Sequence, residues 1–463
     1  MQRKKKILLG VTGGLLVLCL VLASFALWTQ NFTQAGVNVN TFDCFDIQYV
    51  EDSDAINSLN SYPMTDEVGL NTKPYTVIMT NNCPYTVSYV VKLNKMSTTT
   101  LLSSLVRVAI NDVPFSLATK QKTSTSISGA NEAWVVNAGI LPGNASKNIE
   151  TKIWLEENTE LENAKNKTFD FKISIEAQTG GGNYLAGRIL SDNELKTTTP
   201  DFDVAPTDVT SGLYQMEDDD GTSYYFRGSI DNNYVSFAGL LWRIVRINGD
   251  GSIRMISEDS VGESAFNTTG RGHQYVGYTY NNTHNCTNAN PCNGSEGTAT
   301  TMKTYLDNWY NTNLKSYEDK IATADYCNDT SYRLGGDWRY YGAYDRINDD
   351  PITPSLACND ISVNYGGKYK LKIGLLTADE MVLAGYTRTS SITNSYLEKS
   401  SWWWSFSPYS SLTNIANVFG ARSNLGNGNA SGSGGVSPVI NLKADTLITS
   451  GNGTVSNPYV VSD

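Results

Sequence analysis

Two adjacent carboxylates, Asp379 and Glu380, are the residues of this sequence best suited by type to acid–base chemistry. A hydrolytic carboxylate pair acts across a scissile bond and a water molecule, so its two groups must face each other at a distance. Neighbouring residues at the start of a helix diverge instead. Thr377 and Glu380 also match a capping box, which engages the Glu380 side chain at the helix terminus. The pair therefore predicts a structural role.

Metal and nucleophile chemistry have weaker candidates still. The acidic run from Glu217 to Asp220 carries oxygen donors that suit Ca²⁺, but a solvated turn before "GTSYYF" is the commoner arrangement. The two histidines, His273 and His284, form no His-x₃-His motif, and no Gly-x-Ser-x-Gly elbow occurs. The sequence therefore predicts no enzyme, no metal site and no cofactor.

The run "SWWWSFSPY" at 401–409 places three tryptophans in a row. In a strand, Trp402 and Trp404 share one face and Trp403 takes the other. Burying one indole is worth several kcal/mol at about 25 cal/mol/Å², so at least one face must be inside, and we expect the row to be mostly core. The alternative is an aromatic platform that binds a ligand. Its candidate residues are Trp403 and Tyr409, with Trp338, Tyr340 and Tyr341 from the tyrosine-rich run 331–346.

The chain begins with a basic cluster and an apolar segment. Arg3 to Lys6 precede residues 7–28, which are 22 residues without a charge. At about 1.5 Å per residue, a helix of this length spans a hydrocarbon core of ~30 Å. We therefore assign residues 1–30 to a single-pass membrane anchor, with the N-terminus cytoplasmic and the rest of the chain outside. Ser24-Phe25-Ala26 also fits a signal-peptide cleavage site, so secretion after cleavage is the alternative.

Charge and cysteine content agree with export. The net charge of −11 argues against a nucleic-acid partner, which requires a broad basic surface. Cys19 lies in the apolar segment, and the six other cysteines lie outside it, which predicts three disulfides in an oxidising compartment. The sequence alone does not choose among the many pairings. Proximity along the chain favours Cys44–Cys83, Cys286–Cys292 and Cys327–Cys358.

Composition divides the exported part near residue 180. One arginine, Arg107, lies between residues 30 and 178, and eleven follow residue 183. The stretch 179–183 is a glycine-rich linker. Before it, residues 31–178 show β-branched and aromatic residues in period-two alternation, which predicts an all-β sandwich. The expected strands are 44–50, 74–81, 85–93 and 168–178.

Residues 184–463 mix both periodicities and predict an α+β domain without regular βαβ alternation. The stretch 234–257 predicts a hairpin that turns at Asp250-Gly251. Met302, Leu306 and their neighbours Tyr305 and Trp309 fall on one face of a helix. The stretch 371–385 runs from a strand into a helix that ends at Gly385, and 437–443 is a final strand.

The second domain resembles a known type of protein. The ordered motifs "DGTSYYFRG", "YVSFAGLLWRIVRINGDGSIRMI", "YLDNWY", "GLLTADE", "WWWSFSPY" and "PVINLKAD" resemble an uncharacterised surface domain of exported proteins from gut Gram-positive bacteria. Cys327 and Cys358, which flank the tyrosine-rich run, also look like that family. The ending "WW…SP…G…PV" is similar to the C-type-lectin-like fold shared with formylglycine-generating enzymes. This sequence departs from the family pattern at Ser437, where an arginine usually precedes "PVINL".

The first domain resembles the camelysin/TasA group of exported β-sandwich proteins, some of which form extracellular fibres. The resemblance rests on the leader "FALWTQNF" and on "PYTVIMTNNCPYTVSYVVKLN" at 74–94. Camelysin-type proteins have been described as metallopeptidases, but both histidines of this chain lie in the second domain.

These features predict a bacterial cell-surface protein, anchored in the membrane through residues 7–28, with a β-sandwich stalk and an α+β head. The expected role is adhesion or non-catalytic recognition of a glycan or a surface protein. One alternative is a structural subunit of an extracellular fibre or matrix, self-assembled by strand addition. The other is a carbohydrate-active enzyme.

Overall fold

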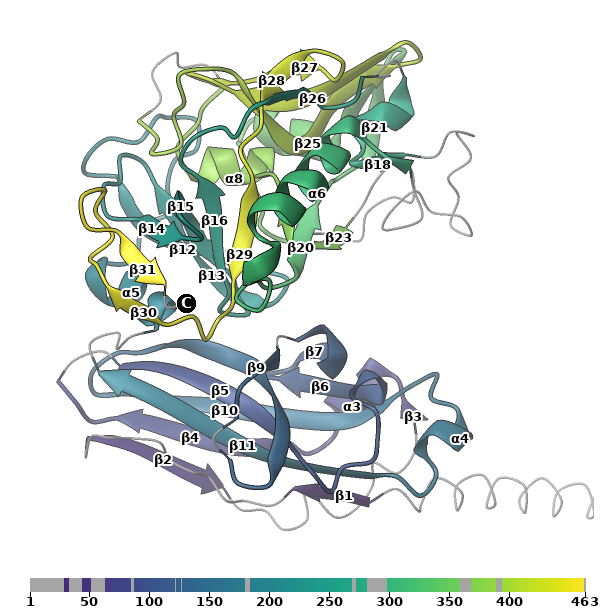
Figure 1. The fold of residues 1–463 in the computed structure, drawn as a ribbon, viewed down its shortest axis with the longest axis vertical. Coiled ribbons are helices and arrows are strands. Elements are labelled where there is room, and N and C mark those ends of the chain that lie inside the picture. Colours follow the sequence, from purple (N-terminus) through teal and green to yellow (C-terminus); the bar gives the residue numbers. More distant parts are fainter. Residues whose placement is uncertain are drawn as a thin grey trace, which may run out of the picture. The chain divides into compact units, whose positions relative to one another are not determined.

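A computed structural model gives the fold of this chain (Figure 1). The structure describes residues 29–32, 44–50, 63–84, 87–120, 122–125, 127–179, 184–268, 272–280, 298–358, 368–388 and 394–461. The chain forms two compact units, Met1–Gly182 and Asn183–Asp463, and their boundary lies in the glycine-rich stretch. Each unit is described by itself.

The first unit is a β-sandwich, as the strand pattern predicts. One sheet has the order β1-β11-β5-β9-β8, and the other has the order β2-β4-β10-β6-β7 with β3 beside β10 (Figure 1). The strands of the first sheet are β1 (Thr29–Phe32), β11 (Thr168–Thr179), β5 (Val87–Met96), β9 (Ala130–Leu141) and β8 (Lys122–Thr123). Those of the second sheet are β2 (Phe45–Val50), β4 (Tyr75–Asn81), β10 (Ala145–Glu156), β6 (Val106–Ile110), β7 (Val113–Ser116) and β3 (Pro63–Met64). The short helices are α3 (Asp66–Leu70) and α4 (Leu161–Ala164).

Both sheets contribute to one core, because alternate residues of their strands point inward. Along β4 every second side chain is buried, and Val77 and Met79 have no exposed surface. On β11 the inward residues are Phe169, Phe171, Ile173, Ile175 and Ala177. The predicted period-two pattern is therefore confirmed, and the core forms between the two β-sheets.

The second unit is also rich in β-sheet. Its larger sheet has the order β24-β29-β16-β15-β14-β31-β30, with β13 beside β15 and β12 beside β13. Its strands are β24 (Ile373–Gly374), β29 (Val439–Leu442), β16 (Ile253–Ser257), β15 (Leu240–Ile247), β14 (Tyr234–Phe237), β31 (Tyr459–Val461), β30 (Ile448–Ser450), β13 (Gly221–Arg227) and β12 (Gly212–Asp218).

A second sheet of this unit has the order β17-β28-β25-β22-β21, with β26 beside β25 and β27 beside β26. Its strands are β17 (Glu263–Ala265), β28 (Ser433–Gly435), β25 (Trp403–Leu412), β22 (Trp338–Tyr341), β21 (Tyr332–Gly335), β26 (Ile415–Ala421) and β27 (Leu425–Asn429). Two small ribbons pair β18 (Thr279–Tyr280) with β19 (Thr298–Ala299), and β20 (Ala324–Cys327) with β23 (Lys368–Leu371). The helices are α5 (Leu185–Asp192), α6 (Thr301–Asn313), α7 (Gly342–Asn348) and α8 (Ala378–Leu383).

Local signals in this unit form the expected elements. Strands β15 and β16 form the predicted hairpin, and Gly251 takes a φ of 85° in its turn, a conformation that glycine adopts without strain. The predicted first arm is divided, because residues 234–237 form a separate strand, β14, that pairs antiparallel with β15. Helix α6 buries Met302 and Leu306. Helix α8 begins with the predicted capping box of Thr377 and Glu380, and Gly385 follows its C-cap with a φ of 115°.

The tryptophan row is mostly core, as expected. Trp403 and Trp404 are 0% and 1% exposed, and Trp402 is half-buried. The Trp402 and Trp404 rings contact each other at 5.9 Å between centroids, and a Cβ at Gly428 or Gly434 would press against them. Trp403 packs against Tyr386. The glycines of the C-terminal run therefore make room for two indole rings.

Two of the predicted disulfides are present. Cys44 and Cys83 are joined with a Cα–Cα distance of 5.0 Å, and Cys327 and Cys358 are joined at 5.4 Å. Both bonds indicate folding in an oxidising compartment. The predicted pair Cys286–Cys292 and the apolar segment 7–28 lie outside the described residues. Within the described ranges, no helix has the length and apolar character needed to cross a membrane.

Candidate functional site

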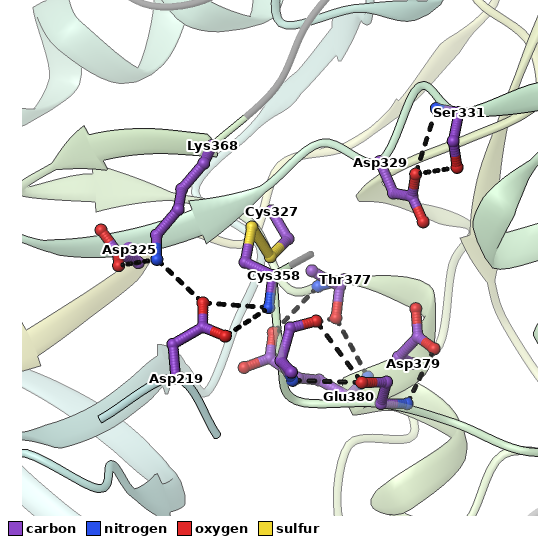
Figure 2. Close-up of a disulfide and its surroundings, with 12 residues drawn as sticks. Asp219, Asp325, Cys327, Asp329, Ser331, Cys358, Lys368, Thr377, Asp379 and Glu380 are labelled. Atoms are coloured by element: carbon purple, nitrogen blue, oxygen red, sulfur yellow. Dashed lines mark hydrogen bonds and ion pairs between the residues drawn. A yellow bond between two sulfur atoms is a disulfide. The ribbon is translucent and has the colours of Figure 1, made fainter. Parts of the chain in front are cut away.

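The adjacent carboxylates of α8 are bound to different arginines. Glu380 is buried and lies 2.6 Å from the Nε of Arg254 and 3.1 Å from the Nε of Arg246. Burial raises the pKa of Glu380, but the charges of Arg254 and Arg246 outweigh it and hold the pKa below its ordinary value. Asp379 accepts two hydrogen bonds from Arg346, and Figure 2 shows Asp379 and Glu380 beside the capping residue Thr377. The carboxylates serve as structural anchors.

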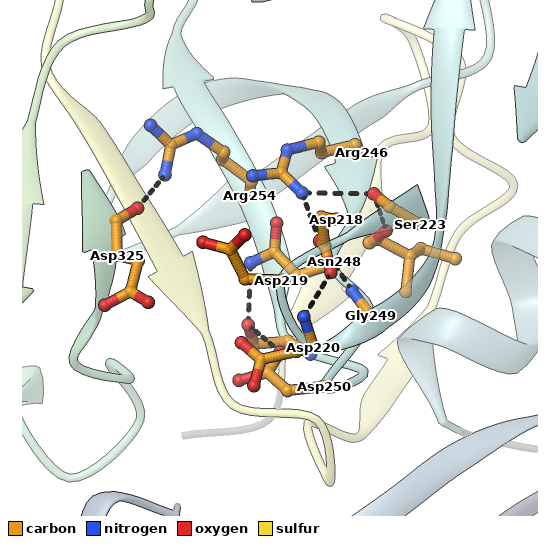
Figure 3. A network of polar contacts seen from close by, with 12 residues as sticks. Asp218, Asp219, Asp220, Ser223, Arg246, Asn248, Gly249, Asp250, Arg254 and Asp325 are labelled. Carbon is orange, nitrogen blue, oxygen red and sulfur yellow. Dashed lines mark hydrogen bonds and ion pairs between the residues drawn. The ribbon is translucent and has the colours of Figure 1, made fainter. Parts of the chain in front are cut away.

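The acidic run Glu217–Asp220, where β12 turns into β13, also binds partners elsewhere in the second unit. It is therefore more than a solvated turn. Asp218 accepts from Arg246 at 2.7 Å and from the backbone of Gly249 at 2.9 Å (Figure 3). Asp219 accepts from the backbone N–H of Cys358 and from Lys368 at 2.8 Å (Figure 2). The sequence could not show these long-range partners. In the described part of the chain, no cluster of His, Cys, Asp and Glu could hold a metal ion.

The Cys327–Cys358 bond closes a loop over residues 328–357, which we call the closed segment. It contains β21, β22 and α7. Near its base, Arg346 donates to Asp329 at 2.6 Å and to Asp379 of α8 at 2.7 and 2.9 Å. A disulfide and a group of ion pairs therefore hold the closed segment against the rest of the second unit.

Strands β21 and β22 form a hairpin that carries aromatic residues on both faces. Arg333 lies opposite Tyr340, and Gly335 lies opposite Trp338, so these four residues share one face. A Cβ at Gly335 would lie 2.7 Å from the Tyr340 ring, so the glycine lets this ring lie against the backbone. Strand β22 joins the sheet through β25. Among the described strands, β21 pairs only with β22.

Five aromatic rings follow one another from this face into the core, and we call them the ring series. The centroid distances along it are 6.4 Å, 4.4 Å, 5.0 Å and 4.8 Å. The inner ring, Phe419, is buried, whereas the four outer rings are half-buried. The inner end therefore holds the outer rings in position while they keep some exposed surface. In order, the members are Trp338, Tyr340, Tyr344, Tyr409 and Phe419.

Charged side chains border the ring series. The Arg333 guanidinium lies 5.2 Å from the Tyr340 ring centroid and 5.6 Å from that of Tyr344. Its Nε donates to Asp345 at 2.6 Å, and its Nη2 lies 3.8 Å from Asp349. The three side chains are 46%, 34% and 62% exposed, in that order. Planar hydrogen-bonding groups therefore lie in solvent beside the aromatic rings.

A second arginine lies near the inner half of the ring series. Arg388 donates to the backbone oxygen of Asn348 at 2.9 Å and to its side chain at 3.2 Å. Burial and the neighbouring Tyr344 and Tyr340 hydroxyls raise the pKa of Tyr409, against the opposing charge of Arg388. Tyr409 therefore stays protonated and able to donate a hydrogen bond at neutral pH.

The structure brings together three of the five residues that the sequence suggests for a ligand platform. Trp338, Tyr340 and Tyr409 belong to the ring series. Trp403 has no exposed surface, because it faces Tyr386 inside the core, so its assignment as a ligand contact is wrong. The assignment of Tyr341 as a ligand contact is wrong for the same reason, since Tyr341 is buried and its hydroxyl lies 2.6 Å from Ser411 Oγ.

Sequence reasoning missed two members of this surface. Tyr344 follows Tyr340 by four residues, but it joins the ring series only because α7 starts directly after β22. Arg333 reaches Tyr340 through the hairpin register, for which the only local signal is the glycine pair at 335–336.

No family model, no characterised protein and no solved structure matches this chain.

Proposed function

We propose that this chain is an exported surface protein whose second unit recognises a ligand without transforming it. The observation that carries the proposal is the ring series, whose four half-buried aromatic side chains are anchored at one end by Phe419. The outer three lie on the disulfide-closed segment, and Tyr409 lies on β25. Tyr, Trp and Arg are the residues most enriched where proteins bind partners, and their stacking needs rings that are already held in place.

The two disulfides support export, because such bonds persist outside the cytosol. The apolar segment 7–28 would keep the protein in the membrane with both units outside, and cleavage of this segment would release it. The first unit would then serve as the stalk, and the second unit as the ligand-binding head.

The two carboxylates best suited to acid–base chemistry are buried in ion pairs, which favours a binding role over a hydrolytic one. Asp379 and Glu380, the strongest acid–base candidates in the sequence, are bound to arginines in the interior of the second unit. A general acid or base must instead reach a substrate and exchange a proton with it.

Binding by cells that display the full chain tests the proposal. Displaying cells are applied to immobilised mucin, glycans and surface proteins, and the variant Trp338→Ala/Tyr340→Ala is compared with wild type. We expect retention to fall about tenfold or more in the variant. Tyr332→Ala is the matched control, because it removes a tyrosine from the opposite face of the same hairpin and should leave retention unchanged. Equal retention of all three forms, or of none, contradicts the proposal.

A fibre subunit is the second candidate, favoured by one feature of the first unit. Strand β1 is four residues long and pairs in parallel with Thr168 to Phe171 of β11. A strand this short can leave its place and add to the same position of a neighbouring copy, since strand addition forms the same main-chain hydrogen bonds between two chains. Electron microscopy of the purified full chain tests this role, which predicts filaments that disappear when residues 29–32 are replaced by glycine and serine.

A further inference from the structure

We infer that the ligand of the ring series is an uncharged saccharide, whose apolar face stacks on Trp338 and Tyr340 and whose hydroxyl groups bind Arg333 and Asp345. This inference rests on the proposed function and names its ligand class. The geometry that supports it is the combination of two aromatic rings and Arg333 on one face of the β21–β22 hairpin with Asp345 of α7, which is bound to Arg333.

The rings match one side of a sugar. Trp338 and Tyr340 lie nearly parallel, with 25° between their planes and 6.4 Å between their centroids. The face of an aromatic ring is electron-rich, so it attracts the weakly positive C–H groups on the apolar face of a pyranose. Two nearly parallel rings that are already fixed offer this contact at a small cost in side-chain entropy.

The charged border matches the other side of a sugar. A hydroxyl group both donates and accepts, so two vicinal hydroxyls can accept from a guanidinium and donate to a carboxylate. Arg333 Nε and Asp345 Oδ1 already lie 2.6 Å apart. Both side chains are also partly exposed, so sugar hydroxyl groups can reach them and form hydrogen bonds with them. Asp349 adds a second, more exposed carboxylate near the same guanidinium.

These charged groups disfavour an apolar protein surface as the ligand. Covering Arg333, Asp345 and Asp349 with hydrocarbon would remove their water without replacing its hydrogen bonds, which costs free energy for each group. The hydroxyl groups of a sugar replace that water directly.

The balance of charge disfavours an ionic ligand. Around the ring series, Arg333 and Arg388 are matched by Asp345 and Asp349. The charges of these four side chains cancel, so the groups beside the rings offer no net attraction to a sulfated or sialylated glycan, nor to a basic peptide. Uncharged sugars are the class that this surface fits.

A glycan array probed with cells displaying the full chain tests the ligand class. Its arms are neutral oligosaccharides, sialylated and sulfated oligosaccharides, and a mucin before and after enzymatic removal of its glycans. We expect binding to neutral glycans that changes less than about twofold between 50 and 500 mM salt, because no net charge is neutralised on binding. Trp338→Ala should weaken it about tenfold.

The polar contact has its own variant. Asp345→Asn keeps the size of the side chain but loses the charged acceptor, and should weaken binding several-fold. The matched control is Asp337→Asn, an exposed change in the turn of the same hairpin, which should bind as wild type does. Thermal unfolding of all variants checks that each one is folded.

The outcomes separate this inference from the proposed function. Binding restricted to charged glycans, or abolished by 500 mM salt, overturns the inference. Equal binding to the deglycosylated mucin, still lost in Trp338→Ala, also overturns it, while the ring series keeps its role in recognition. If no glycan and no protein is bound, both proposals fail.

Discussion

Arg346 and Asp379 form a two-point ion pair, in which Nε and Nη2 lie 2.7 and 2.9 Å from the two carboxylate oxygens. The pair joins α7 of the closed segment to the first turn of α8. The same guanidinium donates to Asp329 at 2.6 Å, and the backbone N–H of Ser355 also donates to Asp379, at 3.0 Å. Because guanidinium and carboxylate match in shape, this arrangement fixes the orientation of α7 as well as its distance from α8.

Arg346→Met should therefore destabilise the second unit by about 3–5 kcal/mol, because it leaves the Asp379 carboxylate buried without its cation. Denaturant unfolding measures the loss. Arg333→Met, which breaks an exposed pair with Asp345, should cost less than about 1 kcal/mol. Similar losses of stability in both variants would mean that the buried Arg346 pair contributes no more to the free energy of unfolding than the exposed Arg333 pair does.

Glu380→Gln should change how stability depends on pH. The folded pKa of Glu380 lies below its ordinary value of 4.5, so the carboxylate contributes stability that is fully present above pH 4.5 and is lost as pH falls through the folded pKa. The variant lacks this contribution at every pH. Wild type and variant should therefore differ most near pH 7 and converge in acid, as measured by thermal unfolding across pH 2–7. Glu398→Gln, an exposed control, should follow wild type.

Loss of the disulfide should loosen the closed segment. In the loop-entropy description, opening a closure of this length by Cys327→Ser/Cys358→Ser costs about 3–4 kcal/mol. We expect faster hydrogen exchange across residues 328–357 and weaker ligand binding. Cys44→Ser/Cys83→Ser, in the first unit, should leave both measurements in the second unit unchanged. Unaltered exchange in the first double variant would show that ion pairs alone hold the segment.

Two tryptophans should separate folding from recognition. Trp403→Ala removes a fully buried indole and should cost about 3–5 kcal/mol of stability, measured by denaturant unfolding. Trp338→Ala, at the outer end of the ring series, should cost much less and act on ligand binding instead. The reverse order of stability losses would contradict the placement of these residues.

Gly335→Ala should weaken ligand binding without removing any aromatic ring. The added methyl group would lie 2.7 Å from the Tyr340 ring, which must then leave its present position beside Trp338. Gly336→Ala is the neighbouring control for space, because nothing lies near its Cβ position. Its φ of 65° makes alanine strained there, so this variant should lower stability slightly and leave the rings in place. Binding by both variants is compared with wild type on the same immobilised ligand.

Much of the secondary structure follows from local patterns. Alternation along β4 and β11 predicts their buried faces, Thr377 and Glu380 predict the start of α8, and Asp250-Gly251 predicts the turn before β16. Each of these signals lies within a few residues of the element that it specifies, so the sequence alone is sufficient to read it.

The ring series was only partly predictable. The sequence shows that Trp338, Tyr340 and Tyr409 are aromatic, but not that β25 brings Tyr409 beside α7 while Trp403 turns into the core. The partners of Asp379 and of the acidic run were equally hidden, because Arg346 and Arg246 lie more than twenty residues away along the chain.

The sequence by itself determined where strands, turns and caps form, which cysteines are close enough along the chain to pair, and that the tryptophan row needs burial. Only the tertiary structure decided which rings stay at the surface and which carboxylates are neutralised. The physical reason is that periodicity and capping act over one or two turns of chain. Sheet order, strand register and the pairing of buried charges depend instead on groups that meet only when the whole unit has packed.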